Sequence, residues 1–157
     1  MNLESKTILV VDDHEIVREG VRSLLAALRP AWTISEAASG SQAVDSVRRN
    51  APDLVIMDVT MPDASGFEVT SRLRETGFDR PVLIFTMHQS ERLVTDVREA
   101  GGQGFVMKSQ ASEDLLRAID ILLNGGTFFS EKQKPDPSRG GPNPVIGFLG
   151  RFALNFA

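Results

Sequence analysis

Short apolar runs alternate along the chain with longer segments in which apolar residues recur at helical spacing. The runs are rich in Val, Ile and Leu, which is typical of strands that are buried on both faces of a parallel sheet. They predict five strands, at residues 6–11, 32–37, 53–57, 81–85 and 104–107. Between them the spacing of apolar residues predicts helices, so the pattern as a whole indicates an α/β fold.

The helices have recognisable start and stop signals. The first begins after the second strand-end aspartate and ends at Pro30, which cannot continue a helix. Ser39, Ser90 and Ser112 each precede or begin a helical pattern and are expected to cap helices that end near residues 49, 100 and 123. The third helix starts near residue 67 and stops near Gly77. On the fourth, residues 93, 94 and 97 are expected to face inward.

Five strands alternating with five helices imply a parallel sheet with right-handed crossovers and helices on both faces. We expect this domain to span residues 1–130 and to close near Phe129. Residues 131–157 are rich in Pro and Gly and are predicted to be a flexible linker and tail. Phe148, Phe152 and Phe156 lie four apart and could form an apolar stripe for a partner. We favour an idle tail, because the nearby glycines weaken a helix.

Composition removes several classes of function. The absence of cysteine excludes disulfides, thiolate metal sites and cysteine nucleophiles. A net charge of −4 does not favour general attraction to nucleic acid, and the tail carries no helix-turn-helix pattern, so we expect no direct DNA binding by this chain. The first residues lack a charged and then apolar leader, and no apolar stretch has the length of a membrane span. We therefore expect a soluble, cytoplasmic protein.

Polar residues of different kinds follow four of the predicted strands. Asp12 and Asp13 follow the first, Asp58 the third, Thr86 the fourth and Lys108 the fifth. The carboxyl ends of parallel strands meet at one edge, where open α/β sheets bind their ligands. Clustered carboxylates are tolerated when a hard cation such as Mg²⁺ lies among them. With a lysine and a hydroxyl nearby, the set suits a carboxylate that attacks phosphorus.

This ordered set resembles the receiver domain of bacterial two-component response regulators. The resemblance covers roughly residues 6–129 and also includes Met61-Pro62 after Asp58, Gly66, and Phe105 before Lys108. Residues 12–20 and 124–130 further resemble the NarL/FixJ subfamily. The resemblance implies a flavodoxin-like (βα)5 three-layer sandwich, as in the CheY-like proteins, with a parallel five-stranded sheet of order 2-1-3-4-5.

The resemblance also implies roles at the pocket. Asp58 would accept a phosphoryl group from a sensor histidine kinase or from a small phosphodonor. Asp12, Asp13, Asp58 and the backbone carbonyl of Thr60 would hold Mg²⁺, and Lys108 would pair with the phosphoryl oxygens. Such a protein catalyses only its own phosphoryl transfer and dephosphorylation, and is a signalling module, not an enzyme acting on other substrates.

The remaining implied roles concern switching. Thr86 would move towards the phosphoryl group and Phe105 would follow it inward. That movement would repack the surface made by the fourth helix, fifth strand and fifth helix, which is the expected site for a partner or for a homodimer. Thr60 and His88, two residues beyond Asp58 and Thr86, would tune the lifetime of the phosphoryl group.

Other interpretations of these residues stay open at this point. Singly, Asp58, Thr86 and Lys108 could be ordinary strand-end residues, and Phe105 could be core packing. An aspartate-nucleophile phosphatase would use a similar aspartate, but it needs a second acid where this chain has Thr60. A flavodoxin-like cofactor binder would need a phosphate-cradling loop after the first strand, where this chain has acids. A phosphorylation-independent protein-binding domain is a further alternative. His14 is interpreted as a loop residue near the acidic pocket.

Overall fold

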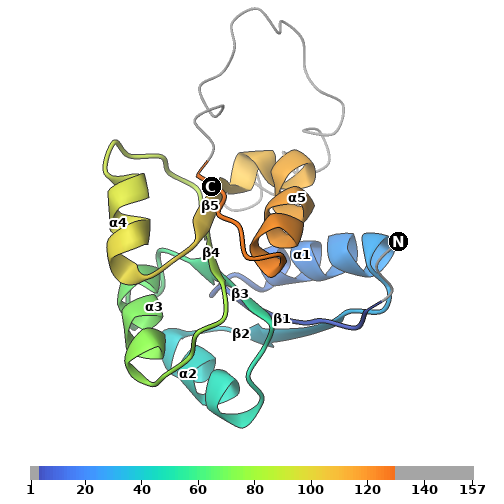
Figure 1. Cartoon of the computed structure of the whole chain (residues 1–157), viewed down its shortest axis with the longest axis horizontal. Helices are drawn as coiled ribbons and strands as arrows, with labels where there is room; N and C mark the ends of the chain where they lie inside the picture. The colour runs from blue at the N-terminus through green and yellow to red at the C-terminus, as the bar shows by residue number, and fades with distance from the viewer. Residues whose placement is uncertain (1–3, 130–157) are drawn as a thin grey trace, which may run out of the picture.

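The computed structural model describes residues 4–129, which form a five-stranded parallel sheet between two layers of helices (Figure 1). The strand order is β2-β1-β3-β4-β5, so the expected fold and strand order are confirmed. Each run of β-branched and aliphatic residues becomes a strand at nearly the expected position. The strands are β1 (Thr7–Val11), β2 (Thr33–Ala37), β3 (Leu54–Asp58), β4 (Val82–Thr86) and β5 (Gly104–Met107).

The helices divide between the two faces of the sheet, as Figure 1 shows. The helices α1 (Glu15–Leu28) and α5 (Ala111–Leu123) cover one face. The helices α2 (Gly40–Arg49), α3 (Gly66–Glu75) and α4 (Leu93–Ala100) cover the other. Two separate apolar cores result, one on each side of the sheet, because successive strand residues point to opposite faces. In β3, for example, Met57 belongs to one core and Ile56 to the other.

Two of the three expected serine caps are wrong. Ser39 caps α2, since its hydroxyl oxygen accepts the Gln42 N–H at 3.2 Å. Ser90 does not cap α4, because residues 90–92 form a turn closed by the Leu93 N–H on the Ser90 carbonyl, and the helix begins only at Leu93. Ser112 lies inside the first turn of α5, since the chain enters that helix through a short 3₁₀ turn, η1 (Lys108–Gln110).

Val94 also differs from the expectation, because its exposed fraction is 36% whereas Leu93 and Val97 are buried. The buried residues of α4 are Leu93, Val97 and Ala100, which follow the spacing of one helical face. Val94 lies about 100° around the helix from Leu93 and is therefore at the border of that face. The later start of α4 leaves only this narrow apolar stripe against the sheet.

The chain beyond α5 returns to the sheet and pairs with β5. Phe128 forms a parallel bridge with Gly104, the Phe105 N–H donates to the Phe128 carbonyl at 3.0 Å, and the Phe128 N–H donates to the Gln103 carbonyl at 3.0 Å. A Cβ on Gly104 would lie 2.5 Å from that Phe128 oxygen, so glycine permits this close approach. The pairing covers the outer edge of β5. The predicted tail, residues 131–157 with its three phenylalanines, lies outside the described residues.

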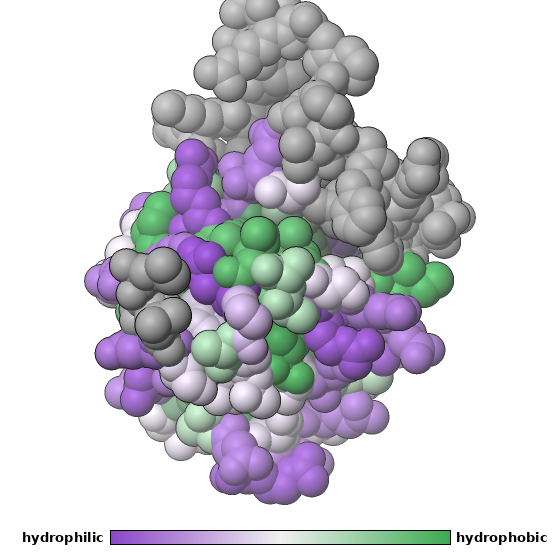
Figure 2. Space-filling view, turned by 90° about the vertical axis from the view of Figure 1, so that its right-hand side faces the viewer, coloured by the Kyte–Doolittle hydropathy of each residue, from purple (hydrophilic) through white to green (hydrophobic). Residues whose placement is uncertain are grey.

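Large apolar side chains are mostly enclosed in the described part of the chain. Those that are exposed are few and scattered: Ile16, Leu28, Met87 and Val94. Figure 2 shows a small hydrophobic patch on the face turned towards the viewer, where most of the other coloured residues are hydrophilic or near neutral. Among residues 4–129 there is no helix with both the length and the apolar character needed to cross a membrane.

Candidate functional site

The carboxyl edge of the sheet brings together four buried polar residues from four strands. Asp12 follows β1, Asp58 ends β3, Thr86 ends β4 and Lys108 follows β5. Their exposed fractions are 1%, 5%, 5% and 8%, although such residues are rarely buried without a partner. The sequence predicted this meeting, and the parallel register of the sheet produces it.

Lys108 is the cation that connects the two buried carboxylates. Its Nζ lies 2.8 Å from Asp12 Oδ2 and 3.2 Å from Asp58 Oδ1. The ammonium group also lies 5.8 Å from the centre of the Phe85 ring. Lysine carries its charge on a flexible stem, so one ammonium can serve both acids. Asp12, Asp58 and Lys108 thus form a buried, poorly solvated group, which we call the ion-paired cluster.

Asp13 and His14 complete an acidic loop between β1 and α1. The His14 backbone N–H donates to Asp12 Oδ1 at 2.9 Å, and its ring Nδ1 lies 3.2 Å from both Asp12 Oδ1 and Asp13 Oδ1. The contact with Asp13 lacks hydrogen-bonding geometry, so Asp13 Oδ1 is a buried oxygen without a hydrogen-bond partner within residues 4–129. His14 is therefore beside the acidic pocket, as the sequence indicated.

The donor set at this pocket fits a hard divalent cation. One ligand atom from each of Asp12, Asp13, His14 and Asp58 can be chosen so that all four lie within 4.8 Å of one another. The Lys108 ammonium contacts Asp12 and Asp58, and its one positive charge does not balance the three carboxylates of the group. The buried Asp13 oxygen without a hydrogen-bond partner is the kind of atom that a cation satisfies. Oxygen ligands of this type are those that Mg²⁺ prefers.

Burial and the neighbouring acid shift the protonation of Asp58. Loss of solvation is the largest influence and the charge of Asp12 adds to it, while Lys108 opposes both. The result raises the pKa of Asp58 from 3.8 to about 6. The carboxylate remains mostly ionised at neutral pH, but it is less stable there than an exposed aspartate. Asp58 is therefore an anion that is poorly solvated in the folded protein.

The loop after Asp58 is held by the Asp63 carboxylate, whose role the sequence did not indicate, and by Gly66, whose position the family resemblance included. Asp63 accepts the backbone N–H groups of Gly40 and Ser41 at 3.0 and 3.1 Å, which ties the loop to the start of α2. These two hydrogen bonds hold the pKa of Asp63 below its usual value. Gly66 begins α3 so close to β3 that a Cβ would overlap the Asp58 carbonyl. The Asp63 contacts join residues 22 and 23 positions apart, so only the fold reveals them.

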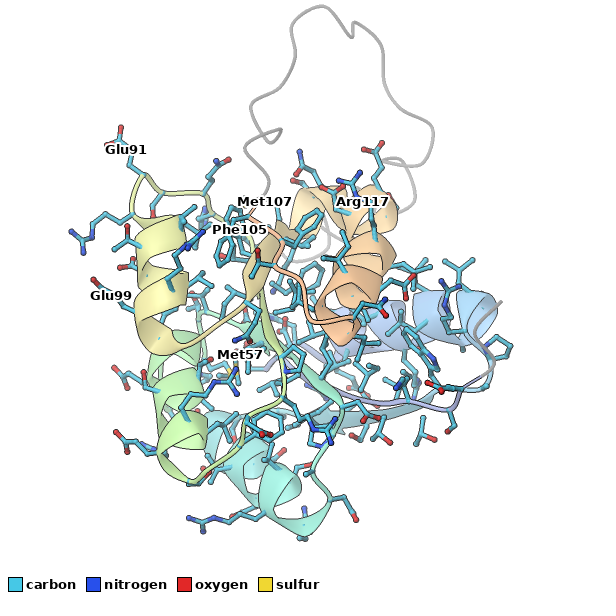
Figure 3. The ribbon with its side chains drawn as sticks, viewed as in Figure 1. Met57, Glu91, Glu99, Phe105, Met107 and Arg117 are labelled. Carbon is cyan, nitrogen blue, oxygen red and sulfur yellow. The ribbon has the colours of Figure 1, made fainter. Side chains whose placement is uncertain are left out.

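Residues proposed for switching lie next to the pocket. The Thr86 hydroxyl is bonded to the backbone of His88, accepting from its N–H at 3.3 Å and contacting its carbonyl oxygen at 3.4 Å. Phe105 is buried on β5, opposite Ile84 of β4. Thr60 and His88 are exposed residues of the loops that follow β3 and β4. Figure 3 shows Phe105 and Met107 between α4 and α5, with Glu91 and Glu99 pointing away from the sheet.

Comparisons with known proteins agree with this geometry. The family model of the response regulator receiver domain matches residues 8–120. The transcriptional regulatory protein DegU of Brevibacillus brevis is 32% identical over 80% of this chain and 53% of its own length. The nitrate/nitrite response regulator NarL of Escherichia coli is 31% identical over 85% of this chain and 62% of its own. The chain thus spans somewhat more than half the length of these relatives.

Solved structures show the same fold. A two-component response regulator of the LuxR family from Aurantimonas has a TM-score of 0.75 and 32% identity, covering 96% of this chain and 99% of its own. The chemotaxis protein CheY4 of Vibrio cholerae has a TM-score of 0.70 and 26% identity, covering 76% of this chain and 99% of its own. The chain belongs to the family of response regulator receiver domains of two-component signalling systems.

Proposed function

We propose that Asp58 is a phosphoacceptor and that its phosphorylation switches a protein-binding surface. A carboxylate oxygen of Asp58 attacks the phosphorus of a phosphohistidine on a sensor kinase, or of a small acyl phosphate. A new O–P bond forms while the bond from phosphorus to the donor breaks, and the leaving imidazole or carboxylate keeps the bonding electron pair. Hydrolysis of the resulting acyl phosphate by water returns the carboxylate.

The observation that carries this proposal is the position of Asp58 in the ion-paired cluster. It is buried, ionised at neutral pH, and 3.2 Å from the Lys108 ammonium. Such a carboxylate is an available nucleophile, since little water must be removed before attack. Lys108 can follow the developing charge on the phosphoryl oxygens, because its flexible stem already reaches both Asp12 and Asp58.

Mg²⁺ is the cofactor that we assign to the acidic pocket. Asp12, Asp13 and Asp58 would hold it, with the Thr60 carbonyl as a further ligand. When bound, the cation neutralises charge between the carboxylates and the incoming phosphoryl group. The excess acidity and the buried oxygen of Asp13 support this assignment. The chain's own residues orient the acceptor and exclude bulk water from it.

The surface that would respond to phosphorylation is inferred from Thr86 and Phe105. We propose that Thr86 gives up its contacts with His88 to bind a phosphoryl oxygen, and that Phe105 repacks in response. This movement would alter the surface of α4, β5 and α5, for binding a partner or a second copy of the chain. Thr60 and His88 lie exposed beside the acceptor and would tune the entry of hydrolytic water.

Incubation with acetyl phosphate and Mg²⁺, followed by intact-mass measurement, tests the proposal. We expect one added phosphoryl group that requires Mg²⁺ and is absent from Asp58→Asn. Asp45→Asn is the matched control, because it makes the same chemical change at an exposed position on α2. A phosphoryl group that survives in Asp58→Asn would disprove the assignment. Absence of any adduct under rapid quenching would favour a phosphorylation-independent binding domain.

A further inference from the structure

His14 occupies the cap position of α1 without capping it. Its backbone is extended, with φ −94° and ψ 109°, as expected of a residue that precedes a helix, but its side chain does not bond to the first turn. The ring is instead turned to the acidic pocket, where Nδ1 lies 3.2 Å from one oxygen of Asp12 and one of Asp13. About half of the side chain is exposed, so it forms the outer wall of the pocket.

These separations match those between neighbouring ligands of a single metal ion. In an octahedral site with bonds of 2.0–2.1 Å, adjacent ligand atoms are about 3 Å apart, and opposite ones about 4 Å. The two separations from Nδ1 are 3.2 Å, close to the adjacent spacing, whereas the ligand atoms of all four residues lie within 4.8 Å of one another, so the group would have to contract around an ion. A cation between Asp12 and Asp13 would therefore also be within reach of the ring nitrogen after small movements.

An imidazole changes which cation such a pocket prefers. Mg²⁺ is bound mainly by oxygen, whereas Mn²⁺, Co²⁺, Ni²⁺ and Zn²⁺ accept carboxylate and imidazole together, and nitrogen favours the later members of this series. In the structure Nδ1 is hydrogen-bonded to Asp12 Oδ1 at 3.2 Å, and an ionised carboxylate only accepts, so Nδ1 carries a proton in that contact. Coordination needs the other tautomer, in which Nδ1 carries a lone pair and Nε2 the proton, so a bound cation would replace this hydrogen bond.

We propose that His14 is a nitrogen ligand of the metal site, so that the acidic pocket binds imidazole-accepting transition metals in preference to Mg²⁺. This rests on the proposed function only in placing a divalent cation among Asp12, Asp13 and Asp58. The inference adds His14 to the proposed metal ligands and names transition metals as the cations that the pocket prefers. The metal available to the protein then influences phosphorylation through the occupant of one pocket.

A competing role for His14 makes the opposite prediction. If the ring were only a protonated counter-ion for Asp12 and Asp13, a metal would have to displace its charge. Replacing it with the uncharged side chain of glutamine in His14→Gln would then leave transition-metal affinity unchanged or raise it, together with Mg²⁺ affinity. If the ring is a ligand, the same substitution lowers affinity selectively for the metals that accept nitrogen.

Titration of the full chain with Ni²⁺ and with Mg²⁺ separates the two roles. We expect His14→Gln to weaken Ni²⁺ binding by at least about tenfold, the lower range for loss of a metal-site partner, and Mg²⁺ binding by less than about twofold. Pulsed electron paramagnetic resonance of bound Mn²⁺ gives a direct readout. The wild type should show coupling to an imidazole nitrogen, and His14→Gln should not. His88→Gln, which removes the other histidine of the chain, should retain it.

The outcomes distinguish this inference from the proposed function. Loss of nitrogen coupling only in His14→Gln supports the inference. Coupling that is absent from the wild type, or that disappears in His88→Gln instead, overturns it, while Mg²⁺-dependent phosphorylation would still stand. A wild type that binds none of these cations overturns both the inference and the magnesium assignment. Circular dichroism of each variant would confirm that the fold is retained.

Discussion

Phe105 and Phe129 meet edge to face, with ring centroids 6.3 Å apart and planes at 63°. The Arg98 guanidinium lies over the Phe129 ring, 4.4 Å from its centroid. Phe129 therefore connects β5 with α4 from a segment that follows α5. Phe105, for which we propose a switching role, contacts Phe129 in the segment after α5. Movement of Phe105 would therefore change the packing of Phe129.

Removal of the Phe129 ring tests this contact. We expect Phe129→Ala to lower the free energy of unfolding by roughly 1–3 kcal/mol, because it removes partly buried apolar area and an aromatic pair. Urea unfolding of the full chain would measure the loss. Arg98→Ala should cost less than about 1 kcal/mol, since a cation–π contact at an exposed site is weak. Equal stability of Phe129→Ala and wild type would show that the pairing contributes nothing.

The raised pKa of Asp58 predicts how stability depends on pH. The pKa is higher in the folded protein, about 6, than its usual value of 3.8, so the folded state holds more protons between these values. The free energy of unfolding, as far as it depends on Asp58, is therefore highest below pH 3.8 and falls as the pH rises towards 6. At pH 7.5 the shifted pKa of Asp58 lowers the free energy of unfolding by roughly 3 kcal/mol, compared with an aspartate of unshifted pKa.

Asp58→Asn should therefore be more stable than the wild type in EDTA at pH 7.5, by up to roughly 3 kcal/mol. The difference should shrink towards pH 3, below the usual pKa of 3.8, where the wild-type carboxyl is largely protonated in both the folded and the unfolded state. Urea unfolding across this range measures it, and Mg²⁺ should narrow the gap by stabilising the wild type. A variant that is less stable than the wild type at pH 7.5 would contradict this interpretation of the cluster.

Gly66 predicts a steric effect on the phosphoacceptor. A methyl group at this position overlaps the backbone carbonyl of Asp58, so Gly66→Ala must displace either β3 or α3. We expect a loss of a few kcal/mol in stability, in the range of overpacked cores, and slower phosphorylation by acetyl phosphate. Gly125→Asn is a suitable control, because nothing lies within 4 Å of its added Cβ and asparagine tolerates its positive φ of 87°. Normal phosphorylation of Gly66→Ala would disprove the constraint.

The lowered pKa of Asp63 predicts a second effect of pH on stability, opposite in sign to the effect of Asp58. Hydrogen bonds from Gly40 and Ser41 lower its pKa in the folded protein, so its contribution to stability is present above the usual aspartate pKa. That contribution is lost as pH falls through the lowered folded value. We expect Asp63→Ala to have a lower melting temperature than the wild type at pH 7, with the difference shrinking under acidic conditions. Asp45→Asn, on the exposed face of α2, is the control for loss of one negative charge.

The sequence by itself determined which segments become strands, their order along the chain, and the kinds of polar residue that follow them. Runs such as 54–57 are short, apolar and bounded by turn residues, and these are local properties that survive without tertiary information. A polar residue directly after such a run must emerge at the edge of the sheet. Asp12, Asp58, Thr86 and Lys108 were identifiable for that reason.

Only the tertiary structure decided how these groups meet. Lys108 and Asp12 are 96 residues apart in sequence, and their 2.8 Å contact exists because parallel pairing aligns the strand ends. The pKa of Asp58 depends on burial and on Asp12, which no local pattern contains. The hydrogen bonds from the start of α2 to Asp63 and the Phe105–Phe129 pair likewise join separate elements. Hydrogen bonds, desolvation and packing between distant segments are properties of the folded chain, so they lie beyond periodicity and spacing.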